Sequence, residues 1–67
     1  MTDFNATERR ANALARRLLR DGHSSRTISD AFITNALALW AAKTGNHIGA
    51  ALLTRAWARI ADRNEAR

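Results

Sequence analysis

Apolar and polar positions follow the period of an α-helix in three successive segments of the chain. In the first, residues 5–21, helical spacing places the apolar residues on one face and arginines on the opposite face. The apolar face comprises Phe4, Ala11, Leu14, Ala15, Leu18 and Leu19. Asn5 with Glu8 three positions later predicts an N-terminal capping box, and Gly22 predicts the C-terminal stop. The pattern therefore predicts an amphipathic helix over 5–21.

The second segment, residues 26–44, has a wider apolar arc. Ile28, Phe32, Ala36 and Leu39 fall on one side, and Ile33, Leu37 and Trp40 fall on the other. Such a helix is expected to be central and covered from two directions. Its N-cap is Ser24 or Ser25, or Thr27 paired with Asp30. The remaining face consists of small residues that permit a close helix neighbour, including one from a second subunit: Ala31, Thr34, Ala38, Ala41 and Ala42.

The third segment, residues 46–65, follows a short break at Lys43–Asn46. Gly45 is suited to end one helix and Asn46 to cap the next. The predicted apolar face of this helix comprises Gly49, Leu52, Leu53, Ala56, Trp57 and Ile60, whereas Arg55, Arg59 and Asp62 are expected to face away. The chain has no proline and no β-branched alternation, so no strand is predicted.

Three helices joined by short turns predict an all-α fold in a compact up-down-up arrangement, forming a single small domain over residues 1–67. A chain of this size buries only about 60% of its unfolded surface. It has no cysteine, so disulfides cannot supplement a small core. We therefore expect the chain to associate as a homodimer.

The charge balance indicates an anionic partner. Lys and Arg total 11 against 6 acidic residues, a net charge of +5, and ten of the eleven cations are arginine. Five of them lie close together in the first segment: Arg9, Arg10, Arg16, Arg17 and Arg20. Such a cluster suits the phosphates of nucleic acid or an acidic protein partner, and it is also compatible with a simple solvated face. No segment is long and apolar enough for a membrane span.

The segment Leu18–Phe32 resembles helix-turn-helix DNA-binding domains. Its core, Gly22-His23-Ser24-Ser25-Arg26-Thr27-Ile28-Ser29, follows Leu18 and Leu19 at the spacing found in transposase-type domains, and it also resembles the turn of repressor and resolvase families. The resemblance implies that the start of the second helix approaches DNA. The residues it implies as contacts for phosphates or a guanine edge are Ser24, Ser25, Arg26 and Thr27.

A second interpretation of the same residues is structural: glycine ends one helix and Ser-Ser-Arg-Thr begins another. Arg17, Asp21 and His23 stand where repressor-type domains place apolar residues, and no break interrupts the second helix near residues 33–35. The sequence leaves both interpretations open.

No catalytic, metal or cofactor site is predicted. His23 and His47 lack further ligands, and neighbouring residues on one turn, such as Asp21, His23 and Ser24, do not converge as a triad. No signal peptide is recognisable, and we expect a cytoplasmic protein. The side chains proposed to line a protein interface are Trp40, Trp57, Ile33 and Leu37.

Two functions are consistent with these patterns. The first is a transcription-regulator-like protein that binds nucleic acid through the turn and the arginine-rich helix face. The second is a protein-binding regulator or inhibitor, of the kind found in phage and plasmid genes, that docks on an acidic partner.

Overall fold

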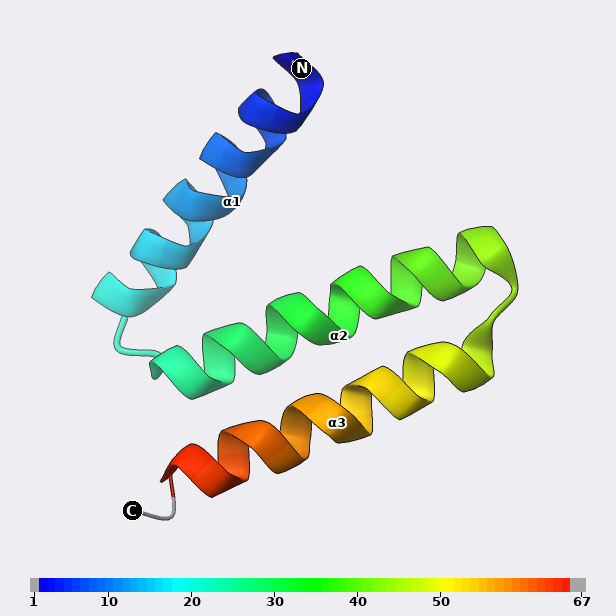
Figure 1. Cartoon of the computed structure of the whole chain (residues 1–67). Coiled ribbons are helices and arrows are strands. Elements are labelled where there is room, and N and C mark those ends of the chain that lie inside the picture. Colours follow the sequence, from blue (N-terminus) through cyan, green and yellow to red (C-terminus); the bar gives the residue numbers. More distant parts are fainter. Residues whose placement is uncertain (1, 66–67) are drawn as a thin grey trace.

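A computed structural model describes residues 2–65 as three α-helices, without strands in that range: α1 (Thr2–Arg20), α2 (Ser25–Thr44) and α3 (His47–Glu65) (Figure 1). The all-α, three-helix prediction is confirmed, and five of the six helix ends lie within one residue of their predicted positions. The exception is the start of α1. Because this helix begins at Thr2, Asn5 and Glu8 lie inside it, and the predicted capping box at Asn5 is wrong.

The turn between α1 and α2 is built by a glycine and a serine. Gly22 adopts a left-handed conformation, with φ of 96°. Its N–H donates to the Leu19 carbonyl at 3.1 Å and the His23 N–H donates to the Leu18 carbonyl at 3.1 Å, which is the Schellman pattern. Ser24 then caps α2, because its Oγ accepts from the Thr27 N–H at 3.1 Å.

The turn between α2 and α3 is equally short. Gly45, with φ of 77°, donates its N–H to the Ala41 carbonyl at 2.7 Å and ends α2. The Asn46 side chain accepts from the Gly49 N–H at 2.8 Å and caps α3, as predicted. A Cβ on Gly49 would lie 2.7 Å from the Asn46 amide nitrogen, so glycine leaves room for this cap.

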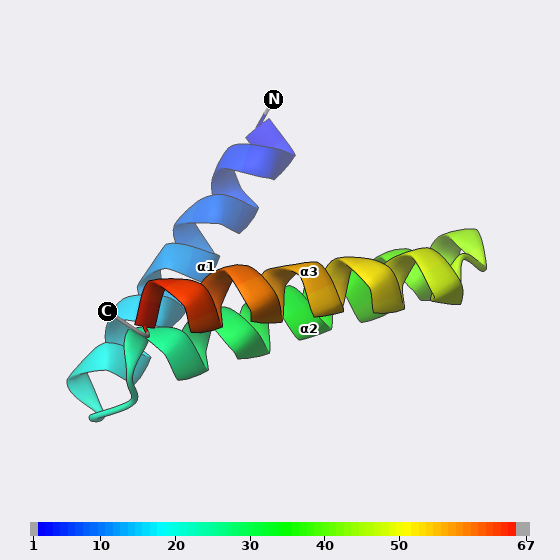
Figure 2. The ribbon, with the colours of Figure 1, turned by 60° about the horizontal axis from the view of Figure 1, so that its bottom comes forward.

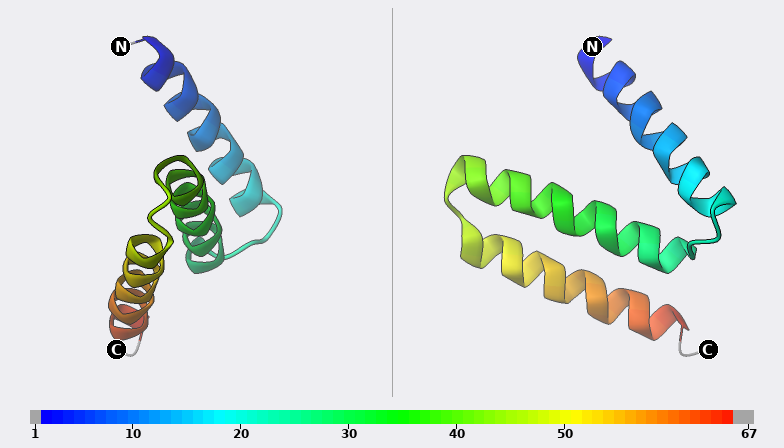
Figure 3. Two further views of the ribbon diagram at one scale, coloured as in Figure 1. Left: turned by 90° about the vertical axis from the view of Figure 1, so that its right-hand side faces the viewer. Right: turned by 180° about the vertical axis from the view of Figure 1, so that it is seen from behind.

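The two turns set different directions of α1 and α3 relative to α2. α2 and α3 run antiparallel and side by side, whereas α1 diverges from the start of α2 (Figures 1 and 2). Viewed nearly along α2, α1 and α3 lie on different sides of it (Figure 3, left). The prediction that the second helix is central is confirmed, because α2 contacts both neighbours, while α1 and α3 do not contact each other within the described range.

The predicted up-down-up arrangement is wrong in being compact, because α1 does not pack against α3 within the described residues. The Cα radius of gyration is 13.7 Å, whereas a compact domain of this length has a radius of roughly 11 Å. The physical reason lies in α2, whose two apolar arcs are centred about 110° apart around the helix. They hold α1 and α3 apart instead of placing both in one groove.

The core is small. In α3 its buried residues, Ala50 and Ala61, lie outside the apolar face predicted from the sequence. Among the described residues, the buried apolar side chains are Ile28, Ala41, Ala50 and Ala61. Among its large side chains, the predicted face of α3 is confirmed only for Trp57, which is half-buried and bonded to α2. It is wrong for Leu52, Leu53 and Ile60, which are each more than half exposed. Alanine faces allow two helices to approach closely, which explains why α3 presents its small residues to α2.

Candidate binding surfaces

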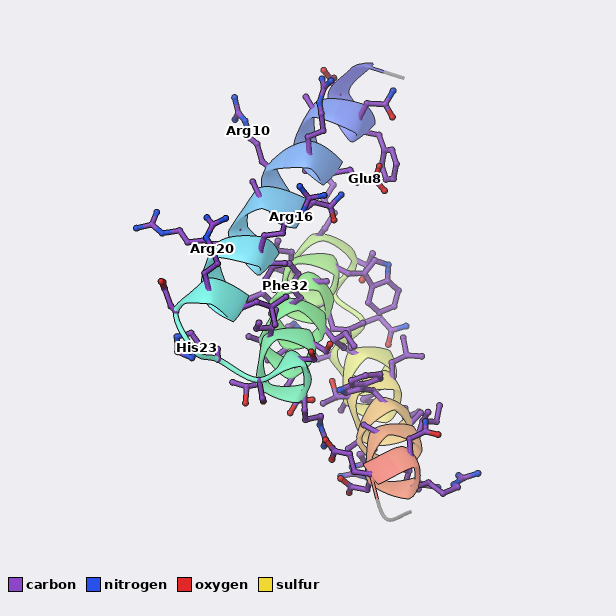
Figure 4. All side chains as sticks on the ribbon, turned by 90° about the vertical axis from the view of Figure 1, so that its left-hand side faces the viewer. Glu8, Arg10, Arg16, Arg20, His23 and Phe32 are labelled. Atoms are coloured by element: carbon purple, nitrogen blue, oxygen red, sulfur yellow. The ribbon has the colours of Figure 1, made fainter. Side chains whose placement is uncertain are left out.

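The Arg surface of α1, defined as Arg9, Arg10, Arg16, Arg17 and Arg20, is the strongest concentration of positive charge. All five side chains are exposed, and none forms an ion pair within residues 2–65. Helical spacing places them opposite the apolar face of α1, and Arg10 and Arg20 project away from α2 (Figure 4). Five arginines against Asp3 and Glu8 give α1 a charge of +3, most of the net charge of +5.

The hydroxyl groups at the start of α2 are largely occupied by the helix itself. Ser24 accepts the capping bond from Thr27 and also donates its Oγ–H to the Thr27 Oγ1 at 2.9 Å. Ser25 is exposed at the first helical position. Of the four residues that the sequence resemblance assigned to DNA, two therefore hold the turn and Ser25 is available to solvent.

Arg26, the fourth, is held by acidic side chains. Its Nε donates to both Asp30 carboxylate oxygens at 3.0 Å, and its Nη2 lies 3.1 Å from the Asp62 Oδ1. Its Nη1 pairs with the Glu65 carboxylate. The expectation that Asp62 faces away from the neighbouring helix is thus wrong. This Arg26 cluster ties the start of α2 to the end of α3.

Trp57 completes the Arg26 cluster. Its indole N–H donates to the Asp30 Oδ1 at 2.6 Å. This bond, followed by the contact with Arg26, lowers the pKa of Asp30 below its ordinary value, while the hydrogen bond to Asp30 raises the pKa of Arg26. Both shifts favour the charged forms of Asp30 and Arg26, and each of the three guanidinium nitrogens of Arg26 contacts a carboxylate within the chain.

The antiparallel hairpin carries the signal that would have revealed this cluster. Arg26 lies 19 residues before Gly45, and Glu65 lies 19 residues after Asn46. A two-residue turn between antiparallel helices places residues equidistant from it side by side. Asp30 is additionally four residues from Arg26 on the same helix face.

The electrostatics of the start of α2 therefore differ from those of α1. Asp21 precedes the helix, and Asp30, Asp62 and Glu65 surround Arg26. Four of the six acidic residues of the chain lie in this region. Their negative charge disfavours approach of a phosphate backbone to this helix start.

The four proposed interface residues occupy two different environments. Ile33 and Leu37 are half-buried, at helical spacing from the buried Ala41, and so lie on the side of α2 that faces α3. Trp57 is half-buried and bonded to α2 through Asp30. Three of the four thus contribute to packing within the chain, and Trp40 remains exposed.

Large apolar side chains are exposed on every helix. On α1 they include Phe4, Leu14 and Leu19, and on α2 Leu39 is 73% exposed on the side from which α1 has diverged. Figure 4 shows Phe32, which shares that side, pointing toward the last turns of α1. Packing of α1 against α2 thus covers Ile28 and Phe32 on this side of α2 but leaves Leu39 exposed.

The described residues hold no pocket and no group of three or more His, Cys, Asp or Glu side chains placed to bind a metal. His23 lies exposed in the first turn (Figure 4) and His47 begins α3. Within residues 2–65, none of the helices has the length and apolar character needed to cross a bilayer.

Comparisons of the chain with protein-family models, curated proteins and solved structures found no match.

Proposed function

We propose that this protein binds nucleic acid through the Arg surface of α1, by contacts with phosphates. The observation that carries the proposal is the row geometry of five exposed arginines that have no ion-pair partner within the described range. From Arg9 to Arg20 they extend about 17 Å along the helix. This length spans several phosphates of one strand, and arginine forks match phosphate oxygens.

The proposed mechanism differs from that of a helix-turn-helix domain. Arg26, which would read a guanine edge, is bonded to three carboxylates. Contacts to phosphates alone fix affinity and carry little sequence information. The protein therefore binds with weak sequence preference, in the manner of a backbone-binding regulator.

The test is fluorescence anisotropy with a random-sequence DNA duplex at several salt concentrations. Binding should weaken steeply as salt rises, because counterions are released from the phosphates. Arg16→Gln should reduce the slope of log affinity against log salt by about 1. The matched control is Lys43→Gln, which removes the same charge from the distant end of α2 and should leave the slope unchanged. Equal effects of both variants, or no binding at low salt, would contradict the proposal.

We further infer that the working form is a homodimer. The chain exposes 5730 Å², whereas a folded monomer of 7.4 kDa exposes roughly 4,200 Å². The excess of about 1,500 Å² per chain falls within the area that obligate dimers bury. Sedimentation equilibrium should give a mass twice that of the chain, and a monomer at tens of micromolar would refute this inference.

An acidic protein partner is the second candidate, because exposed Phe4 and Leu19 accompany the Arg surface on the same helix. Capture from a nuclease-treated lysate separates the two functions. A protein retained after nuclease treatment, and lost with Arg16→Gln, would favour the protein partner.

A further inference from the structure

We propose that α1 of one copy packs its apolar face against α3 of a second copy, and that the contact is reciprocal. The inference rests on the proposed self-association and is independent of nucleic-acid binding. It specifies which helix covers which, so that the two α1–α3 contacts are related by a two-fold axis.

Two uncovered apolar surfaces of similar size carry the proposal. On the apolar face of α1, only Ala15 and Leu18 are half-buried, and Phe4 is 64% exposed. On α3, helical spacing aligns a second row, here named the α3 stripe: Gly49, Leu52, Leu53, Ala56 and Ile60. Its leucines and Ile60 are more than half exposed. The stripe extends about 17 Å along α3, and the exposed part of the α1 face, from Phe4 to Leu14, extends about 15 Å, so the two surfaces match in length.

The charges beside these surfaces favour pairing of α1 with α3. Glu8 lies between Phe4 and Ala11 by helical spacing, and it is exposed without an ion pair among the described residues. Arg59 and Arg63 border the α3 stripe in the same unpaired state. In an antiparallel α1–α3 pair centred on Ala11 and Ala56, Glu8 therefore lies opposite Arg59. Arg10 and Arg16 also border this face of α1, so the gain comes from the one Glu8–Arg59 pair.

The alternative pairings oppose like charges when the helices run parallel. Two parallel α3 stripes would bring the bordering Arg59 and Arg63 of both copies together, and two parallel α1 faces would oppose their Glu8 side chains. In the antiparallel self-pairings, Arg59 lies opposite Leu53 and Glu8 lies opposite Leu14. Like charges across an interface select against the wrong partner, so the two parallel self-pairings are disfavoured.

Within a single chain α1 and α3 are too far apart to form this contact, so it requires a second copy. α1 and α3 lie on different sides of α2 and do not contact each other within residues 2–65 (Figure 3). The surface excess of about 1,500 Å² per chain is of the size that two such helix contacts per dimer can bury. The part of the apolar face of α1 that is exposed within its own chain, from Phe4 to Leu14, is thus covered in the proposed dimer.

The experiment is disulfide trapping between two single-cysteine variants of the full chain. The protein has no native cysteine. Ala11 and Ala56 are the central residues of α1 and α3, and both are exposed, so alanine-to-cysteine changes disturb little. Central positions meet in a full-length helix pair whether it is parallel or antiparallel. An affinity tag on one variant identifies mixed dimers in a glutathione buffer.

Mixing Ala11→Cys with Ala56→Cys should yield mixed disulfide dimers above the proportion expected from random pairing. Disulfides need Cα atoms within about 7 Å, so Ala13→Cys, on the opposite side of α1, should yield few with Ala56→Cys. Predominant Ala56→Cys self-pairing, or equal yields with Ala13→Cys, would overturn the pairing while leaving self-association intact. A chain that sediments as a monomer would overturn both inferences.

Discussion

Replacing Ser24 with alanine separates the structural role of the first turn from a role in DNA contact. The side chain of Ser24 accepts the Thr27 N–H at 3.1 Å and begins α2. Alanine removes this acceptor and leaves a helix N-terminal N–H to water. The neighbouring Ser25 is one position further along and is also exposed, so Ser25→Ala provides a matched control.

The magnitude follows from the cap. Loss of an N-cap serine costs about 1 kcal/mol, within a range of roughly 0.5–2 kcal/mol. The Ser24 side chain is solvent-exposed, which places the expected value in the lower half of this range. For a domain of this size, about 1 kcal/mol lowers Tm by roughly 4–8 °C. Ser25→Ala should change Tm little, because no hydrogen bond of its side chain stabilises the turn.

The assay is thermal unfolding followed by circular dichroism, with all proteins at one concentration because dimer stability depends on it. A Tm loss for Ser25→Ala equal to that of Ser24→Ala would refute the assignment of the cap. The same two variants also test the binding mechanism. If Ser25→Ala weakens DNA binding at unchanged Tm, the start of α2 touches DNA, and the phosphate contacts of α1 are insufficient to explain binding.

Four further results follow from the turns, the core and the Arg26 cluster. Gly45→Ala should cost about 1–2 kcal/mol in urea unfolding, because φ of 77° is unfavourable for alanine although its Cβ meets no atom. Ile28→Ala should cost about 2–5 kcal/mol in the same assay, since this side chain is buried between elements. Trp57→Phe should raise the pKa of Asp30 toward its ordinary value in an NMR titration, because the indole donor is lost. The folded-state pKa of Asp30 is lowered, so its stabilising effect is present at neutral pH and declines as pH falls below about 4. The difference in Tm between the native chain and Asp30→Asn should shrink over that interval, and a constant difference would contradict the assignment.

Five of the six helix ends were predictable from the sequence because they depend on neighbouring residues, and the start of α1 at Thr2 was not. Gly22, Gly45 and Asn46 act through bonds to residues within five positions, and the sequence shows both partners of each bond. The apolar face of α1 was also evident, since one strong period defines it. The position of the Arg surface follows from the same spacing.

Arrangements between helices were less predictable, for reasons visible in α3. This helix has one face with Leu52, Leu53 and Ile60 and another on which Trp57 lies among alanines, and periodicity alone does not decide which one packs. Close approach of two helices favoured the alanine face with Ala50 and Ala61. The role of Arg26 was missed for a related reason. Its bonds to Asp62 and Glu65 join residues far apart in sequence, whereas the helix-turn-helix resemblance implied a DNA contact from neighbouring residues alone.

A core of one isoleucine and three alanines has a consequence for the amount of protein in a cell. The proposed self-association would make this fold more stable as its concentration rises, because the second copy binds only the folded chain. Scarce chains are then open to proteases, while abundant chains protect one another. The level of such a protein responds to its synthesis rate as a threshold, so a small rise in expression separates near absence from persistence.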